Sequence, residues 1–240
     1  MVKAIYLRKH TRAEFRDRMR SGELQACVLP VAAIEQHLEH LEMEHDWRSV
    51  IDVAEQVAER LSPQVLIAEG VMVGVSEHHM THAGSLTLRP GTFLSVVNDL
   101  VRSLAMAGFE NILVLNGHGG NIIPCRSNWD QFLREFRINL HFLPYWDVLD
   151  ESDAARLRSG QRMPQDLPGH AQEFETAVAL ARFPENVRHD AMESQQDQTP
   201  RMATAELGEA LMERVVEGVA DYLAAMIAGQ REAGVPSFHP

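Results

Sequence analysis

Short apolar runs alternate with amphipathic helical stripes along this chain, and this alternation limits its possible folds more than any other feature. The apolar, strand-like runs are 26–33, 65–75, 111–115 and 139–149. Apolar residues at helical spacing fill the segments 50–61, 92–104, 129–136, 170–182 and 203–228. Strands that alternate with helices need crossover connections, which favour a parallel sheet covered on both faces. We therefore predict an α/β fold for residues 1–240, a single-domain three-layer sandwich with a mostly parallel sheet.

Composition and charge exclude several classes of protein. With 240 residues and 45% hydrophobic content, the chain can bury one substantial core. It has no run of apolar residues long enough to span a membrane, and its first residues lack the apolar stretch of a secretory signal. A net charge of −12 disfavours a nucleic-acid surface. Because Cys27 and Cys125 are isolated, we expect reduced thiols and a cytoplasmic protein.

A dense polar cluster follows the first apolar run. The stretch VAAIEQHLEHLEMEHDW, residues 31–47, contains Glu35, His37 and Asp46. If the chain stays extended, Glu35 and His37 lie on the same side, and Asp46 follows after enough loop to fold back. Buried groups of this kind cost several kcal/mol unless they are paired, protonated or bound to a cation. Carboxylate and imidazole ligands suit zinc, manganese or iron, so we predict a divalent-metal site; the alternative is a solvated loop of charges.

A second cluster, NGHGGN at 116–121, lies at the end of the third apolar run. Ligands of parallel sheets collect at the carboxyl ends of strands. The glycines beside His118 let the backbone turn sharply and let a ligand approach closely. His118 is therefore a candidate ligand, although a histidine that only closes the turn is the alternative.

The third cluster is PGHAQEFETA, residues 168–177, where a helix is expected to begin. On an ideal helix His170 and Glu173 share a face, whereas Glu175 points about 200° away from Glu173. A regular helix would therefore keep these two carboxylates from binding one metal. The alternative is that both acids only favour the helix N-terminus through its dipole.

Four stretches, taken in order, resemble the creatininase (creatinine amidohydrolase) family. They are LPVAAIEQHLEHL followed by Asp46, then SEHHMTHAGSLTL, NGHGGN and GHAQEFETA, spread over roughly residues 25 to 180. The resemblance implies a creatininase-like α/β domain with a mostly parallel sheet, two adjacent divalent metals and hydrolysis of amide-type C–N bonds. It also implies a homo-oligomer, a hexamer in many members.

The resemblance also implies a role for individual residues. Glu35 and His118 would hold one metal, His37 the other, and Asp46 would bridge them. His170 matches the family's proton-handling histidine and Glu175 its partner acid. His78 matches a histidine near the substrate entrance, and the neighbouring His79 and His82 are interpreted as part of a substrate-contacting or solvated loop.

Three departures from the family pattern bear on the substrate and the second metal. Creatininase has a glutamate where this chain has Gly120, and Glu173 is the candidate replacement; whether Glu173 or Glu175 completes the second metal site stays open. The family's usual sequence H-G-P-H-L-P is replaced here by H-L-E-H-L-E, residues 37–42. The loss of Gly and Pro and the gain of two acids predict an altered pocket rim. The tryptophan that precedes the third block in creatininase is absent, which argues against creatinine as the substrate.

The function expected from these features is metal-dependent hydrolysis of a C–N bond, other than an ordinary peptide bond, in a small and possibly cyclic molecule. Two cations would activate water and polarise the carbonyl. His170 would pass a proton to the leaving nitrogen, and backbone amides of Gly119 and Gly120 would hold the oxyanion. The alternatives are a hydrolase that opens a keto-cyclitol ring at a C–C bond, a deformylase or peptidase, and a non-catalytic metal-binding assembly module.

Overall fold

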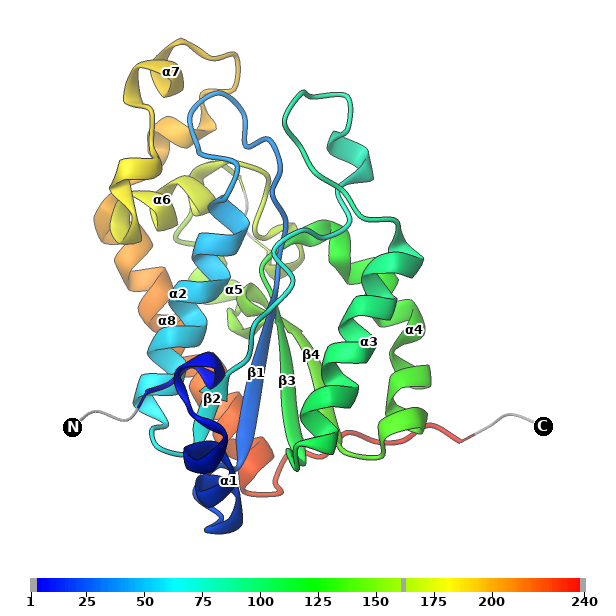
Figure 1. The fold of residues 1–240 in the computed structure, drawn as a ribbon. Helices are drawn as coiled ribbons and strands as arrows, with labels where there is room; N and C mark the ends of the chain where they lie inside the picture. The colour runs from blue at the N-terminus through cyan, green and yellow to red at the C-terminus, as the bar shows by residue number, and fades with distance from the viewer. Residues whose placement is uncertain (1–3, 161–162, 238–240) are drawn as a thin grey trace.

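A parallel four-stranded sheet forms the centre of the protein in the computed structural model, which describes residues 4–160 and 163–237 (Figure 1). The strands are β1 (Ala26–Val31), β2 (Val65–Ile67), β3 (Asn111–Asn116) and β4 (Asn139–Pro144). They lie in the order β2-β1-β3-β4, and all three neighbouring pairs are parallel. The predicted parallel sheet is confirmed.

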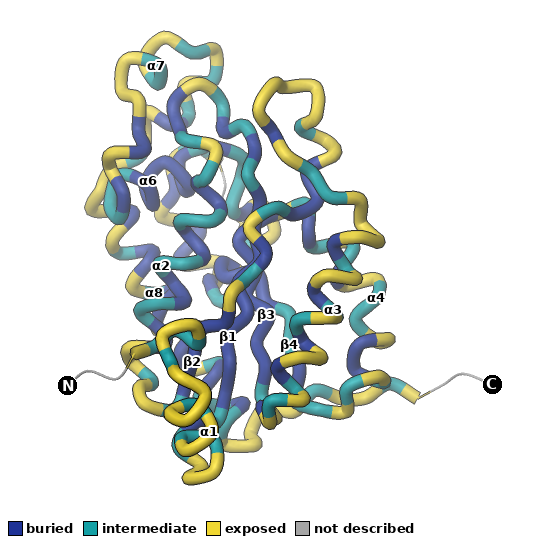
Figure 2. Tube along the Cα trace, viewed as in Figure 1, coloured by how far each residue is buried: buried dark blue, intermediate teal, exposed yellow. Residues whose placement is uncertain are grey.

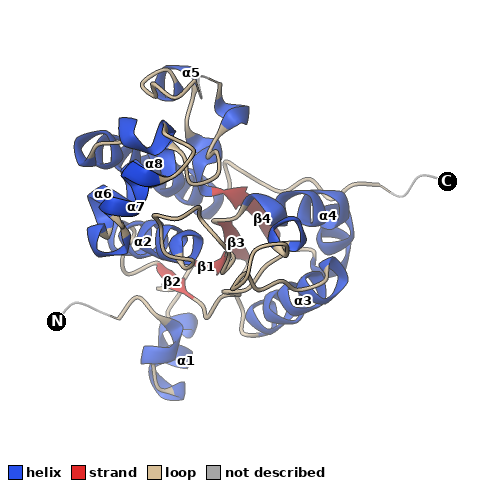
Figure 3. Ribbon diagram, turned by 90° about the horizontal axis from the view of Figure 1, so that it is seen from above, coloured by secondary structure: helices blue, strands red, loops and turns tan. Residues whose placement is uncertain are grey.

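Helices cover both faces of this sheet, which confirms the three-layer architecture. In Figure 3, α2, α6 and α8 lie on one side of the strands and α3 and α4 on the other. The helices are α1 (Arg12–Arg20), α2 (His45–Arg60), α3 (Pro90–Met106), α4 (Ile122–Phe136), α5 (Glu151–Ala154), α6 (Glu173–Arg182), α7 (His189–Ser194) and α8 (Ala205–Ile227). No helix in the described part of the chain is both long enough and apolar enough to cross a membrane.

The alternation of side chains along β1 explains why both faces are covered. Ala26 and Val28 belong to the core that contains residues of α2 and α8, whereas Cys27 and Leu29 belong to the core that contains residues of α3 and α4. Successive side chains of a strand point to opposite faces, so a strand that is apolar throughout needs cover on both sides. Figure 2 accordingly shows buried strands at the centre and, on both sides of them, helices that carry exposed residues.

The structure differs from the sequence prediction at several boundaries. The run 65–75 is a strand only to Ile67, because the chain then crosses the end of β1, where the N–H of Val71 donates to the carbonyl of Pro30 at 3.0 Å. The run 139–149 ends as a strand at Pro144 and continues as a 3₁₀ turn over Tyr145–Val148. The segment 183–202, expected as an irregular loop, contains α7 and two 3₁₀ turns.

One end of the sheet gathers the chemically active segments. The chain leaves β1 into the segment that carries Glu35 and His37, and it leaves β3 into the segment that carries His118. The carboxyl ends of the strands and the N-termini of α2 and α6 lie toward the upper part of Figure 1. The fold thus brings the three polar clusters of the sequence to one edge, as expected for parallel sheets.

Candidate metal centre

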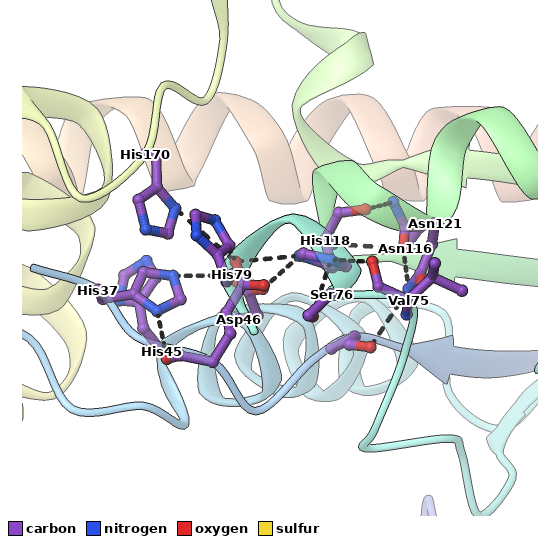
Figure 4. A network of polar contacts seen from close by, with 12 residues as sticks. His37, His45, Asp46, Val75, Ser76, His79, Asn116, His118, Asn121 and His170 are labelled. Carbon is purple, nitrogen blue, oxygen red and sulfur yellow. Dashed lines mark hydrogen bonds and ion pairs between the residues drawn. The ribbon is translucent and has the colours of Figure 1, made fainter. Parts of the chain in front are cut away.

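Asp46 lies in the first turn of α2, not in a loop as the sequence analysis supposed. Its carboxylate is buried and faces a histidine with each oxygen: Oδ1 lies 3.0 Å from Nε2 of His37, and Oδ2 lies 2.8 Å from Nδ1 of His118. Figure 4 shows the two histidines on opposite sides of Asp46. Each oxygen of this buried carboxylate thus lies beside an imidazole nitrogen that could share a cation with it.

Both of these histidines are held by a backbone carbonyl through their other ring nitrogen. Nδ1 of His37 lies 3.0 Å from the carbonyl oxygen of Glu35, and Nε2 of His118 lies 3.0 Å from that of Val75. Because a carbonyl only accepts, these nitrogens carry the protons, and the lone pairs of the neutral rings face Asp46. Lone pairs that face carboxylate oxygens at this distance need a proton or a cation between them, and this orientation of the second ring nitrogen is typical of metal-bound histidine.

Glu35 completes this side of the cluster. Its Oε1 lies 3.4 Å from Nδ1 of His118, and its buried Oε2 has no hydrogen-bond partner. Burial, the largest influence, raises the pKa of Glu35. A buried carboxylate oxygen without a donor is satisfied when it binds a cation.

The pKa values of His37 and His118 also indicate an excess of negative charge in the cluster. Burial, the largest influence, would lower the pKa of His37, but the charge and hydrogen bond of Asp46, with the charge of Glu175, raise it to about 10. The pKa of His118 is also raised, since Asp46 and Glu35 outweigh the effect of burial. Positive charge is therefore favoured at this position, whether it is carried by protons or by divalent ions.

Glu173 and Glu175 point in different directions from the start of α6. Oε2 of Glu175 lies 3.8 Å from Nε2 of His37 and accepts from the N–H of Ala171. Oε2 of Glu173 instead accepts from the N–H groups of Arg158 and Ser159, at 2.5 and 2.6 Å. Helical geometry separates the two acids as expected, but the structure brings Glu175, and not the predicted ligand Glu173, to the cluster.

Gly120, which lies beside His118 in the cluster, has no room for a side chain. A Cβ there would lie 2.1 Å from the carbonyl oxygen of Val75 and 2.4 Å from Nε2 of His118. Both contacts are far below van der Waals distance. This backbone therefore excludes a side chain at Gly120, so that after Asp46 the carboxylate found near His37 is that of Glu175.

The cluster opens on a cavity of about 350 Å³. The predicted substrate-binding residues His78, Gly119 and Gly120 line it, together with Glu35, Asp46, His79, His118, Pro168, Gly169, His170 and Glu175. A volume of this order accommodates a small molecule. The side chain of His170 is 31% exposed, so it can meet a molecule in the cavity.

His79, interpreted from the sequence as part of a substrate-contacting or solvated loop, lies against the cluster. Its Nε2 lies 3.6 Å from Oε1 of Glu35, and its ring stacks on that of His170 with centroids 4.2 Å apart. Burial, the largest influence, and neighbouring histidines lower the pKa of His79 to about 4 and that of His170 to about 3, so both rings are neutral near pH 7. The sequence did not indicate its contacts with Glu35 and His170, which His79 makes from a short 3₁₀ turn, Glu77–His79.

The donor set as a whole suits a divalent cation. Within the described residues, four sets of three candidate ligand atoms lie within 4.8 Å of one another, and all four belong to this cluster. They consist of imidazole nitrogens and carboxylate oxygens, which bind zinc, manganese and iron, and contain no thiolate. The residues present therefore fit a metal centre.

A parallel α/β sheet with a buried histidine–carboxylate cluster at its carboxyl edge defines a metal-dependent hydrolase. Residues 8–223 match the profile of the creatininase family, described as creatinine amidohydrolase, and the chain belongs to this family. The resemblance noted from the sequence is confirmed.

Three relatives of this chain are named for different activities. Creatinine amidohydrolase from Pseudomonas putida is 28% identical, over 92% of this chain and 96% of its own length. The 3-dehydro-scyllo-inosose hydrolase of Thermotoga maritima is 26% identical, over 75% of this chain and 57% of its own length. A mycofactocin precursor peptide peptidase from Mycobacterium ulcerans is 28% identical, over 47% of each chain.

Solved structures agree in fold. A crystal structure of creatinine amidohydrolase superposes with a TM-score of 0.81 and 26% identity, over 94% of this chain and 98% of that chain. A variant creatininase of the Zn–Zn type and a manganese creatininase each give a TM-score of 0.79 at 25% identity, over 94% of this chain and 99% of theirs.

Proposed function

We propose that this protein binds two divalent cations, zinc, manganese or iron, and hydrolyses an amide-type C–N bond of a small, possibly cyclic substrate. The observation that carries the proposal is Asp46, whose two oxygens face His37 and His118. Glu35, Asp46 and His118 would hold one cation; His37, Asp46 and Glu175 would hold the other. The zinc and manganese forms of related creatininases support the first two of these metals.

The bound cations would supply a water of lowered pKa and a polarised carbonyl. The chain itself would orient the substrate and move the proton. His170, stacked on His79 at the cavity wall and neutral at rest, would take up the proton that the attacking water releases and pass it to the leaving nitrogen, a role worth typically ~10² to 10⁴-fold in rate. The backbone amides of Gly119 and Gly120, with the ring of His78, would hold the substrate oxygen and fix its orientation.

A second candidate reaction is hydrolytic opening of a keto-cyclitol ring at a C–C bond. The Thermotoga maritima relative supports it, since it matches three quarters of this chain. A ketone oxygen could occupy the same place as the amide oxygen in the cavity. A panel of cyclic amides, formamides and cyclitol ketones, assayed with zinc-, manganese- and iron-loaded protein, separates the two reactions.

Metal content tests the bridging role of Asp46 directly. Asp46→Asn removes the charge that would bind both cations, so we expect elemental analysis to find less than one metal per chain instead of two. Asp52→Asn is the matched control: Asp52 lies on the same helix but contacts Gln56 and Arg182. An Asp46→Asn protein that keeps two metals would refute the proposal.

The two acids of α6 provide a second matched pair. Glu175→Gln is expected to lower the metal content to about one ion per chain, because Glu175 faces His37. Glu173→Gln is expected to keep both metals, because its carboxylate binds backbone N–H groups elsewhere. The opposite result would restore Glu173 as the ligand.

A further inference from the structure

His40 is a fully buried histidine that the proposed reaction does not use. Nδ1 of its ring lies 3.2 Å from Oε1 of Gln195, and Nε2 lies 2.8 Å from Oγ1 of Thr176. Both distances are within the range of ordinary hydrogen bonds. The ring therefore joins two parts of the chain that lie 155 and 136 residues away from it in the sequence.

The contact with Gln195 holds the ring from the side of α7. Oε1 of Gln195, the residue after α7, also accepts from the backbone N–H of Glu39 at 3.2 Å. Because a backbone N–H only donates, the amide oxygen must face this segment, and Nδ1 of His40 donates to it. The backbone of His40 is held as well, since its carbonyl oxygen accepts from the N–H of Arg188 at 2.7 Å. The ring and the backbone of His40 are thus both anchored.

The contact with Thr176 reaches the helix that carries Glu175. Thr176 follows Glu175 in α6 and is fully buried. Its hydroxyl can donate or accept, so it bonds to Nε2 of His40 whether or not that nitrogen carries a proton. The hydroxyl also lies 3.5 Å from the carbonyl oxygen of Ala171, a longer contact. The shorter bond ties α6 to the segment around His40.

This bond links two segments that would each supply a ligand of the second cation. His40 comes three residues after His37, and Thr176 is next to Glu175. Nε2 of His37 and Oε2 of Glu175 lie 3.8 Å apart, which is too far for a hydrogen bond, so these two groups do not hold each other. The bond between His40 and Thr176 is a direct connection close to both of them.

The first cation would not depend on this connection. Its ligands would be Glu35, Asp46 and His118, which come from the segment after β1, the start of α2 and the segment after β3. The side-chain bonds of His40 reach none of these three residues. A loss of the connection should therefore affect the two cations unequally.

We propose that His40 is a positioning residue for the second cation: its bond to Thr176 sets the separation of His37 and Glu175, and thereby the affinity of the site that they share with Asp46. This role of His40 rests on the function proposed above. Loss of a group that orients a metal ligand typically lowers metal affinity about 10- to 100-fold.

Thr176→Val tests the connection, because it removes the hydroxyl with little change of shape. Zinc binding to the chelator-treated protein is measured by isothermal titration calorimetry. The dissociation constant of one zinc ion should rise about 10- to 100-fold, while that of the other stays within about threefold. Thr176→Ser restores the hydroxyl and should bind both ions as the unaltered protein does.

Thr204→Val is the matched control for a general loss of stability. Oγ1 of Thr204 caps α8 by accepting from the N–H of Leu207 at 3.1 Å, so the same substitution removes a hydrogen bond away from the cluster. Both zinc ions should bind to this variant as tightly as to the unaltered protein.

Gln195→Met tests the other end of the connection. It removes the acceptor of the His40 ring at a half-buried position and leaves the hydroxyl of Thr176, with its contact to Ala171, in place. It should weaken the same single zinc ion, and it carries the test if Thr176→Val does not fold.

Three results would overturn this role of His40: both zinc ions bound by Thr176→Val or Gln195→Met as tightly as by the unaltered protein, both ions weakened equally, or Thr176→Ser as weak as Thr176→Val. Fewer than two zinc ions on the unaltered protein would refute the proposed function, and the role of His40 with it. The unaltered protein thus decides the function and the variants decide the role of His40, so the two failures are distinguishable.

Discussion

Gly208 allows α8 to pack directly against the backbone of α6, and replacing it tests how closely the two helices must approach. A Cβ at Gly208 would lie 1.9 Å from the carbonyl oxygen of Ala177 and 2.4 Å from its carbonyl carbon. Nonbonded atoms meet comfortably at about 3.5 Å, so Gly208→Ala requires the helices to separate by more than about 1 Å. Overpacking of this kind typically costs about 1–3 kcal/mol, and higher helix propensity returns at most about 1 kcal/mol. We expect the free energy of unfolding to fall by about 1–2 kcal/mol.

Urea denaturation followed by circular dichroism measures this change. Gly91→Ala is the matched control: Gly91 lies in the first turn of α3, and no atom lies within 4 Å of a Cβ built there. The control should be stabilised by up to about 1 kcal/mol, because alanine loses less backbone freedom on folding. If Gly208→Ala were as stable as the unaltered protein, the close contact between α6 and α8 would be refuted.

Two further changes probe the site and the scaffold separately. His170→Ala should keep its metals but lose turnover by about 10²- to 10⁴-fold on a verified substrate; retained activity would rule out its role with the proton. Arg137→Gly should raise the free energy of unfolding by about 0.5–1 kcal/mol, because exposed Arg137 ends α4 at φ 50°, where glycine is unstrained. Gln131→Gly, at an exposed position inside α4, should lower the free energy of unfolding by about 1 kcal/mol. Equal effects of glycine at both positions would contradict this reasoning.

Local sequence pattern predicted the sheet and the place of the site well, because both depend on short-range features. The runs 26–31 and 112–115 are apolar throughout, and polar residues follow each of them. Parallel pairing then brings Glu35, His37 and His118 to one edge without further information.

Features that depend on distant contacts could not be predicted in this way. Asp46 looked like part of a loop because the apolar stripe of its helix was placed from Val50, while the first turn is mostly polar. His79 was interpreted as part of a substrate-contacting or solvated loop, and its contacts could not be predicted because its partners, Gln36 and His170, are remote in sequence. Helix α1 has a T-x-x-E capping signature at Thr11 and Glu14, but its residues bury little and gave no apolar stripe.

The assembly state and the cellular location stay predictions from the resemblance and the composition. Sedimentation of the metal-loaded protein would show whether it forms the expected hexamer. A monomer at micromolar concentration would contradict that expectation.

The groups at the cavity come from remote parts of the chain: Gln36 and His170, for example, are 134 residues apart. In short metal-binding motifs the ligands are neighbours, and an unfolded chain can already capture an ion. Here Glu35, His37 and Asp46 are close in sequence, but the other proposed ligands, His118 and Glu175, join them only when β3 and α6 are in place, so cations would bind the native state more tightly than the denatured one. A free cation concentration of a hundred times Kd would then add about 2.7 kcal/mol per ion to the free energy of unfolding. Chelators should therefore lower the melting temperature.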